Sequence, residues 1–329
     1  MAEVNEIVPL PHVPVGDAVE VAVDWVGDVA DPVFDAFSTG VSAFIDAFVT
    51  LLLLPPPLVL VALLALLGGL IRSARFGAGS LVALVLVVSM ELWVEFVETL
   101  AFIIGATLVA AVIAVPLGIL AARSARASAL FKPVLDLMQT MPPFVYLIPA
   151  VAFFSIGTVP GFVTTVVFAL PPGVRLTELG IRQVDAEVVE AGTAFGGTPR
   201  QILRGIQLPL ALPTIMAGIN QVIMLALSMA VIAGLIGGGG LGSVVVRAIS
   251  SLDLALGFEA GLSVVVLAIY LDRLTAALGS GTPRLRLERA RSLLNRGSTS
   301  TEGGDTGSET ASEEQRGSEQ RNSRRPALR

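Results

Sequence analysis

The sequence has no cysteine, one histidine and one lysine among its 329 residues. Without cysteine there can be no disulfide, no thiolate zinc site and no cysteine nucleophile. His12 lies in the polar N-terminal stretch, so we do not expect histidine-dependent triads or multi-histidine metal sites. Lys132 lies in "LFKPV" and not in the GxxxxGK[ST] pattern of a phosphate-binding loop. We therefore predict no catalytic residue, no metal site and no bound cofactor in this chain.

Charged residues are also scarce, at 15% of the chain, whereas hydrophobic residues make up 54%. Soluble domains contain about 25% charged residues, so this composition is typical of a membrane protein with several spans. The net charge of −6 argues against nucleic acid as a partner. A bilayer core needs about 20 apolar residues per helix. Long apolar runs that approach this length occur at residues 55–71, 77–90, 99–122 and 212–237.

Arginine and lysine gather in alternate loops between the predicted spans. The loops after the first, third, fifth and last spans carry Arg72 and Arg75; Arg123, Arg126 and Lys132; Arg175, Arg182, Arg200 and Arg204; and Arg284, Arg286, Arg289 and Arg291. The intervening loops are acidic or nearly neutral. Because basic loops stay in the cytoplasm, this pattern predicts about seven transmembrane helices, with the N-terminus outside and the C-terminus in the cytoplasm. The expected fold class is an all-α integral membrane protein in the plasma membrane, in contact with membrane lipid.

The first fifty residues do not resemble a signal peptide, because they lack a basic start and a compact apolar run near the N-terminus. Carboxylates recur there at helical spacing, opposite a stripe of valines. They are Asp17, Glu20, Asp24, Asp28, Asp31 and Asp35. We expect one or two amphipathic helices at the membrane surface, with Asp31-Pro32 as a helix start; a solvated tether is the alternative. After residue 297 the chain is rich in Ser, Thr, Gly and Glu, which predicts a disordered cytoplasmic tail.

One polar stretch interrupts the apolar runs. Its sequence is "EAGTAFGGTPRQILRGIQLP", residues 190–209. A short amphipathic helix is expected to end at "FGG", because glycine adopts the left-handed conformation at a helix C-terminus without strain. Thr198 and Pro199 are typical of the cap and first turn of a second helix. A helix–turn–helix with small residues at its bend can serve as a docking surface or as a plain loop between spans. It offers no nucleophile–base pair for catalysis.

The spacing within this stretch resembles the EAA loop of ABC importer permeases. That pattern is EAA, three residues, Gly, nine residues, then I-x-L-P. It is matched here by Glu190, Ala191, Gly192, Gly196, Ile206, Leu208 and Pro209. Gly192 replaces the third-position alanine, which costs about 1 kcal/mol of helix propensity. The resemblance implies that residues 182–209, hereafter the coupling loop, form a helix that inserts into a separate P-loop ATPase subunit, which uses ATP and Mg.

From about residue 95 to 278 the sequence is similar to permeases of glycine betaine/proline betaine importers. Further segments that carry the similarity are "VLDLMQTMPPFVYLIPAVAFFSIGTVPG" and "AIYLDRLT". The resemblance implies a type I permease core at residues 95–280, after two accessory transmembrane helices at 53–94 and an extracellular-side acidic segment at 1–52. Residues 281–329 complete the chain as a basic and then disordered tail. It also implies an external substrate-binding protein and a homodimer around a central path, importing a compatible solute.

Two sets of side chains are candidates for the translocation path. Prolines and aromatics in "QTMPPFVYLIP" predict a broken helix that could line it, although aromatic packing against lipid or other helices explains them equally. Polar residues in the sixth span could line the path or bond between helices. The candidates are Pro142, Pro143, Phe144, Tyr146, Asn220, Gln221 and Ser228. The glycine run "GGGGLG" at 237–242 is expected to be an external hinge or a contact for a binding protein.

Two other functions remain open from sequence. One is the same type of importer for choline, carnitine or an amino acid, because the coupling loop is shared widely among importers. The other is an ATP-independent channel or secondary carrier. Proton-coupled carriers usually need an ionisable group at mid-membrane, and the carboxylates here lie near the ends of the predicted spans.

Overall fold

The computed structural model describes residues 14–279 and contains helices without strands in that part of the chain. The proposed tail at 281–329 and His12 lie outside the described residues. The N-terminal half comprises α1 (Val15–Leu53), α2 (Pro57–Ile71), α3 (Ala74–Ser89), α4 (Trp93–Arg123), α5 (Ala125–Thr140) and α6 (Pro143–Phe154). The remainder comprises α7 (Thr158–Arg182), α8 (Ala186–Ala194), α9 (Pro199–Ile202), the π-helical η1 (Leu203–Gln207), α10 (Leu208–Ala233), the 3₁₀-helical η2 (Gly234–Ile236), α11 (Gly240–Ser251) and α12 (Leu254–Gly279).

Helix α4 lies at the centre of the core. Its side chains Phe96, Val97 and Ile103 are fully buried, and they join a continuous cluster with residues of α7, α10, α11 and α12. Small residues let the central helices approach closely: a Cβ on Gly173 of α7 would lie 2.8 Å from the Cβ of Ala114 on α4. Close approach through small residues is how helices pack in a membrane, where apolar burial between helices contributes little.

Five helical segments of the described chain are long and apolar enough to cross a bilayer. They are Val29–Leu53, Trp93–Arg123, Thr158–Arg182, Pro199–Ile236 and Leu254–Gly279. Helices α5 and α6, bent by 97° at a short break, would make a sixth as one broken span. The sequence predicted α2 and α3 as two further spans, but they have 15 and 16 residues, fewer than the about 20 that a bilayer core requires.

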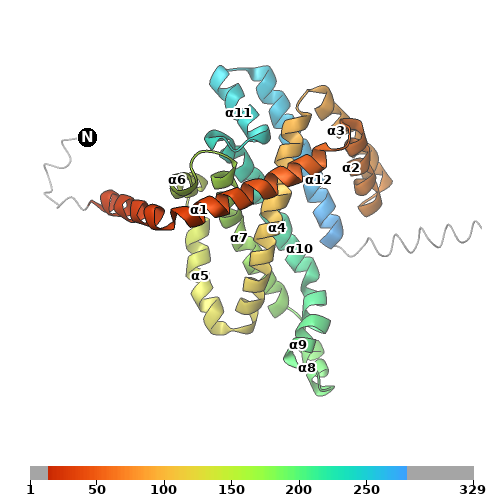
Figure 1. The fold of residues 1–329 in the computed structure, drawn as a ribbon. Helices are drawn as coiled ribbons and strands as arrows, with labels where there is room; N and C mark the ends of the chain where they lie inside the picture. The colour runs from red at the N-terminus through yellow and green to blue at the C-terminus, as the bar shows by residue number, and fades with distance from the viewer. Residues whose placement is uncertain (1–13, 280–329) are drawn as a thin grey trace, which may run out of the picture. The chain divides into compact units, whose positions relative to one another are not determined.

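The N-terminal segment forms one continuous helix, α1, and the predicted helix start at Asp31-Pro32 is wrong, because Pro32 lies inside α1. Pro32 is exposed, so the carbonyl that its ring leaves unbonded can be hydrated. Figure 1 shows α1 running across the long helices instead of alongside them. Its first half carries an exposed apolar stripe at intervals of four, which suits a helix lying on a membrane. The stripe consists of Val21, Trp25, Val29, Val33 and Phe37.

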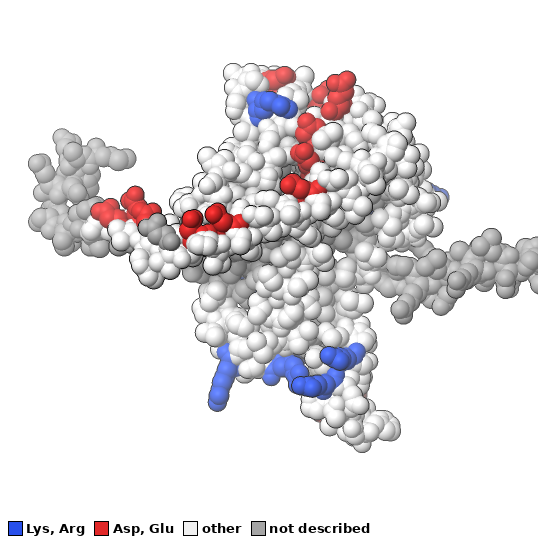
Figure 2. Space-filling view, viewed as in Figure 1, with Lys and Arg blue, Asp and Glu red and all other residues white. Residues whose placement is uncertain are grey.

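The charges separate toward two ends of the bundle. Lysine and arginine gather at the end that carries the α4–α5 turn, α8 and α9 (Figure 2). We call this the basic end, although the carboxylates of Asp185, Glu187 and Glu190 at α8 also lie there. Carboxylates line α1 and the opposite end, where α4, α7 and α12 begin and where α11 lies (Figure 2). We call this the acidic end, although Arg247 on α11 also lies there.

Candidate functional site

The first helix of the coupling loop, α8, is closed at both ends by local hydrogen bonds. At its start, the Asp185 carboxylate accepts from the backbone N–H of Glu187 at 2.9 Å. At its end, the N–H of Gly197 donates to the carbonyl of Gly192 at 3.1 Å, and Gly196 has φ of +79°. This left-handed glycine satisfies carbonyls that would otherwise lack partners and reverses the chain. The termination predicted at "FGG" is confirmed.

The second helix begins with a capping box. Thr198 caps it, its hydroxyl accepting from the N–H of Gln201 at 3.4 Å, while the Gln201 side chain accepts from the N–H of Thr198 at 2.8 Å. Pro199 occupies the first turn, where its missing N–H leaves no helical bond unmade. The predicted Thr-Pro start is therefore confirmed.

The coupling loop does not end at Leu208-Pro209, as the sequence suggested. Instead α9, η1 and α10 continue as one helical segment, Pro199–Ile236. The N–H of Leu208 donates to the carbonyl of Leu203, five residues earlier, which makes one wide π-helical turn. Pro209 explains this turn, because its ring would crowd the carbonyl four residues before it and it has no N–H to donate. The chain thus enters α10 without a break.

The EAA-pattern residues divide into an inner and an outer set, and the inner set holds the two short helices together. A Cβ on Gly192 would lie 2.6 Å from Cδ1 of Ile206, so the glycine makes room for the second helix to lie close. Ile202 is buried, and its Cγ1 would lie 3.7 Å from the same Cβ. Leu208 packs against the apolar cluster at the base of α7 and α10. The sequence assigned Gly192 only a cost in helix stability and missed this contact.

The outer set faces solvent. Glu190, Ala191 and Pro209 are exposed, and Val188 is 41% exposed. At the tip, between α8 and the glycine pair, the Phe195 side chain is 94% exposed. An aromatic ring exposed to water at a turn is typical of an anchor for a partner protein. Sequence reasoning treated this phenylalanine only as part of the helix end, although an aromatic between two helices and beside two glycines was a usable signal.

A polar brace ties the base of the coupling loop to two neighbouring helices. Arg182, the last residue of α7, pairs with Glu178 at 3.0 Å and donates to the carbonyl of Ala121 near the end of α4 at 2.9 Å. Ser128 of α5 donates to the same Glu178 carboxylate at 2.7 Å. Arg175 on α7 also pairs with Asp136 on α5. A force on the coupling loop therefore reaches α4, α5 and α7 together.

Of the predicted path residues, those in "MPPFVY" form the bend between α5 and α6. Pro142 and Pro143 are the cap and first residue of α6, so they cause the 97° break predicted from the prolines. Phe144 is 55% exposed. Tyr146 braces the bend, because its hydroxyl donates to the carbonyl of Met138 and its ring lies edge-on to Phe168.

The polar residues of α10 separate into two roles. Asn220 bonds between helices: its amide donates to Asp272 at 3.0 Å and its carbonyl accepts from Thr275, both on α12. Gln221 and Ser228 lie on an exposed face of the same helix, where the Ser228 hydroxyl donates to its own turn at Met224. Only the latter two remain available to line a path.

Comparison with known proteins is consistent with this arrangement. Residues 114–282 match the family described as the binding-protein-dependent transport system inner membrane component. The chain belongs to this family. It is 48% identical over 267 residues to the glycine betaine/proline betaine transport system permease protein ProW of Escherichia coli (strain K12), covering 81% of this chain and 75% of that one. It is 46% identical over 274 residues to the glycine betaine/carnitine transport permease protein GbuB of Listeria monocytogenes, covering 82% and 96%.

A solved structure of the MetNI methionine ABC transporter, in an inward facing conformation, has the same fold. It aligns with a TM-score of 0.50 and 25% identity over 59% of this chain and 95% of that chain. The family match confirms the permease resemblance predicted from sequence. The structural match confirms the predicted all-helical membrane architecture. The coupling loop lies within the part of the chain that matches the family.

Proposed function

We propose that this chain is the membrane-spanning subunit of an ATP-driven importer for glycine betaine or proline betaine. Relatives at 44–48% identity over about four fifths of the chain are named as permeases for these solutes. The chain moves its substrate without chemistry of its own. A separate P-loop ATPase, which uses ATP and Mg, drives the cycle, and a separate external binding protein delivers the substrate.

The observation that carries the ATPase partnership is the exposed tip of the coupling loop. The Phe195 ring is 94% exposed, and the hydroxyl, carboxylate and backbone contacts within the loop hold it in place. Docking would bury this ring in an apolar cleft of the ATPase, with the exposed Glu190 available for a basic residue nearby. The brace at Arg182 would then transmit the movement of the ATPase to α4, α5 and α7.

The charge separation supports the proposed orientation. The basic end, with the coupling loop, faces the cytoplasm, where the ATPase is found, and the acidic end faces outward. The N-terminus then lies outside and the C-terminus inside the plasma membrane. This assignment places the coupling loop and its partner in the same compartment.

An exposed stripe on α10 supports a homodimer around the path. Its residues recur at alternating intervals of four and three, the spacing of a helix face that packs against another helix. They are Ala217, Gln221, Met224 and Ser228. A second copy facing this stripe would enclose Gln221 and Ser228 between the subunits, where their polar groups could contact a zwitterionic solute. Lipid would cover the apolar surfaces that remain.

The substrate has an alternative with specific support. GbuB is named for carnitine as well as glycine betaine, and a relative from Ruegeria pomeroyi that is 42% identical over 56% of this chain is named for trimethylamine N-oxide. These solutes share a methylated nitrogen. Competition of unlabelled carnitine, choline and trimethylamine N-oxide against labelled glycine betaine uptake separates them, and competition by an amino acid alone would contradict the betaine assignment.

The test of the proposed function is co-purification of the ATPase with Phe195→Ala and a matched control. Wild-type chain, extracted in detergent from its native membrane, is expected to bring down a P-loop ATPase. Phe195→Ala should reduce the recovered ATPase roughly tenfold or more, since an anchor residue contributes about 2 kcal/mol. Phe258→Ala removes a ring that is 74% exposed at the acidic end and should leave recovery unchanged. A folded wild-type chain that recovers no ATPase would favour an ATP-independent channel or carrier.

A further inference from the structure

A run of glycines connects α10 to α11 at the acidic end. We call residues 234–242 the glycine turn. Gly237, Gly239 and Gly240 have φ of +78°, +78° and +59°, values that residues with side chains rarely adopt. Helix α11 begins at Gly240, and Gly239 at its N-cap has no side chain that could bond its first N–H groups.

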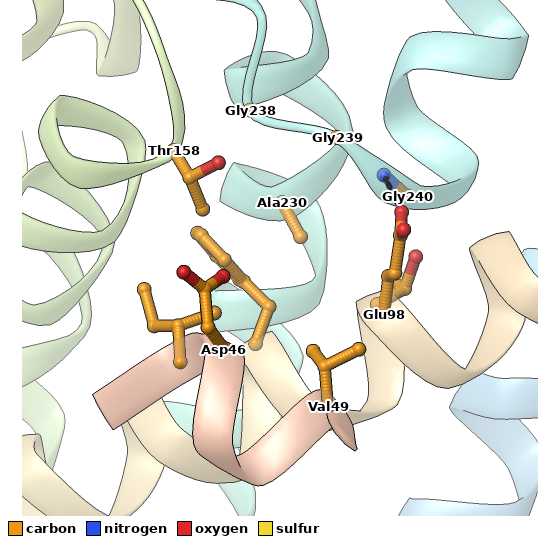
Figure 3. A pocket seen from close by; sticks show the side chains of 11 residues that line it. Asp46, Val49, Glu98, Thr158, Ala230, Gly238, Gly239 and Gly240 are labelled. Atoms are coloured by element: carbon orange, nitrogen blue, oxygen red, sulfur yellow. Dashed lines mark hydrogen bonds between the residues drawn. The ribbon is translucent and has the colours of Figure 1, made fainter. Parts of the chain in front are cut away.

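Helix α4 supplies the missing caps from 142 residues away in sequence. The N–H of Gly240 donates to Oε2 of Glu98 at 2.9 Å, and the N–H of Leu241 donates to Oγ1 of Thr99 at 2.8 Å. Figure 3 shows Glu98 reaching up to the start of α11. The Thr99 hydroxyl also donates to the carbonyl of Glu95 at 2.7 Å, which aims its lone pairs at α11. Two neighbouring residues of one helix thus cap the N-terminus of another.

Two other glycines of the turn lie close against backbone, while its Leu241 side chain is buried in the core. A Cβ on Gly242 would lie 2.4 Å from the carbonyl oxygen of Ala230, and one on Gly234 would lie 2.2 Å from the carbonyl carbon of Gly242. No side chain of these glycines can interlock with α10. The caps from α4 are therefore the bonds that tie the start of α11 to a distant helix, beside the turn's own bond from the N–H of Gly238 to the carbonyl of Ala233 at 2.9 Å.

A cavity lies directly beside these caps. Its volume is about 160 Å³, and Asp46, Glu98, Thr158, Ala230 and the glycine turn line it. Figure 3 shows the Asp46, Thr158 and Ala230 side chains around this space, beneath Gly239. Glu98 is partly exposed, so water in the cavity can replace its bond to Gly240. The turn thus has both an exchangeable bond and space to move.

We propose that Glu98 and Thr99 form a latch that holds the glycine turn and α11 against α4, and that this latch opens during the transport cycle. Its opening in the cycle rests on the proposed importer function, whereas the latch itself does not. Glu98 and Thr99 are positioning residues: they set the place of α11 and do not need to touch the solute. Their carboxylate and hydroxyl satisfy N–H groups that are otherwise left to water when α11 moves.

The absence of cysteine allows a clean reporter for this movement. Ala230 is 7% exposed and its side chain borders the cavity under the glycine turn, so Ala230→Cys places one thiol where opening would uncover it. The probe is a maleimide dye larger than the cavity, applied to this chain alone in detergent. Thr99→Val and Glu98→Ala should each speed labelling about fivefold, which corresponds to about 1 kcal/mol for a lost N-cap.

Conservative variants separate a latch from general loosening. Thr99→Ser keeps the hydroxyl and should restore the slow rate, and Glu98→Gln keeps an acceptor oxygen and should be close to wild type. A thiol at Ala169→Cys on α7, a position that is 1% exposed, should stay unlabelled throughout. The latch is overturned if Thr99→Val leaves the rate unchanged, if Thr99→Ser is as fast as Thr99→Val, or if the thiol at position 169 becomes reactive in parallel.

The role in the cycle is measured on the assembled transporter in lipid nanodiscs. Adding ATP, Mg, binding protein and glycine betaine should change the labelling rate of Ala230→Cys at least twofold, and Thr99→Val should lower the maximal uptake rate more than it changes the apparent affinity for the binding protein. A labelling rate that turnover does not alter would overturn the gating role. If the chain recovers no ATPase, the importer assignment fails, but the labelling of the isolated chain still decides whether the latch exists.

Discussion

The two ends of this protein are built in different ways. Among the described residues of the coupling loop, at the basic end, only Gly196 has a positive φ. The acidic end carries three strained residues with side chains, Glu91, Ser155 and Leu252, each with φ near +60°. Four glycines with positive φ lie there as well, at positions 157, 237, 239 and 240. Unusual backbone conformations thus concentrate at one end.

The difference reflects the range of the interactions at each end. Within the coupling loop, Asp185 caps α8 and Thr198 pairs with Gln201, so partners are two or three residues apart. At the acidic end, Glu98 and Thr99 bond residues that are 142 positions away. A loop whose hydrogen bonds join residues close in sequence keeps its shape when neighbouring helices move, which suits a docking element. A turn held by a few distant bonds can be released, which suits a moving element.

The largest effect is expected where backbone meets backbone at the acidic end. A Cβ on Gly234 would lie 2.2 Å from the carbonyl carbon of Gly242, and backbone cannot swing aside. Gly234→Ala should therefore destabilise the chain by about 3 kcal/mol, within the range for overpacking, and abolish uptake. The measurement is the midpoint of thermal unfolding in detergent, together with uptake. Gly261→Ala on α12 meets nothing within 4 Å and serves as control; it should unfold no earlier than wild type.

An intermediate effect is expected at the base of the coupling loop. Arg182→Met removes the ion pair with Glu178 and the bond to Ala121, while it keeps the length of the side chain. Because Arg182 is 45% exposed, solvent already screens the pair, and we expect about 1 kcal/mol of lost stability. Uptake should fall further than ATPase recovery, since the loop still docks but is no longer braced. Equal losses of both would show that Arg182 only maintains the docking surface.

The smallest effect is expected for Gly192→Ala, which restores the family pattern. The new methyl group would lie 2.6 Å from Cδ1 of Ile206, but this atom ends a flexible side chain and can move. Alanine adds about 1 kcal/mol of helix propensity, so the net change in stability should be within about 0.5 kcal/mol, with ATPase recovery unchanged. Gly197→Ala, whose Cβ would lie 2.8 Å from the carbonyl oxygen of Gly192, should be clearly worse. If Gly192→Ala and Gly197→Ala lose equal stability, the difference between a flexible side-chain neighbour and a backbone neighbour does not explain which glycines of the coupling loop can be replaced.

The coupling loop could be predicted from sequence because its signals are local. The glycines that end α8, the Thr-Pro start of α9 and the fixed spacing of the EAA pattern all act over a few residues. The membrane class and the bend at Pro142-Pro143 could be predicted for the same reason. Prediction failed at Pro32, since an exposed helix tolerates an internal proline that sequence rules treat as a boundary.

Other features depended on which helices become neighbours. From sequence, Asn220 could either line a path or bond to another helix. The structure shows that it bonds to Asp272 and Thr275 on α12. From sequence, Gly192 was interpreted only as a loss of helix stability. The structure shows that its missing side chain makes room for Ile206. Glu98 was noted only as a carboxylate near a span end and Thr99 not at all, because no local pattern marks a residue that caps a distant helix.

The sequence by itself determined that this is a polytopic all-helical membrane protein whose apolar runs are interrupted by one polar helix–turn–helix, and the EAA pattern in that stretch indicated the permease family. The membrane class and the helix–turn–helix follow from composition, helix periodicity and short-range capping, which act between residues close in the chain, whereas the family came from its resemblance to the EAA pattern. The tertiary structure alone decided which polar groups brace helices, which remain free to face a partner, and how α4 secures the start of α11. These depend on pairs of residues far apart in sequence, whose contacts exist only once the helices have packed.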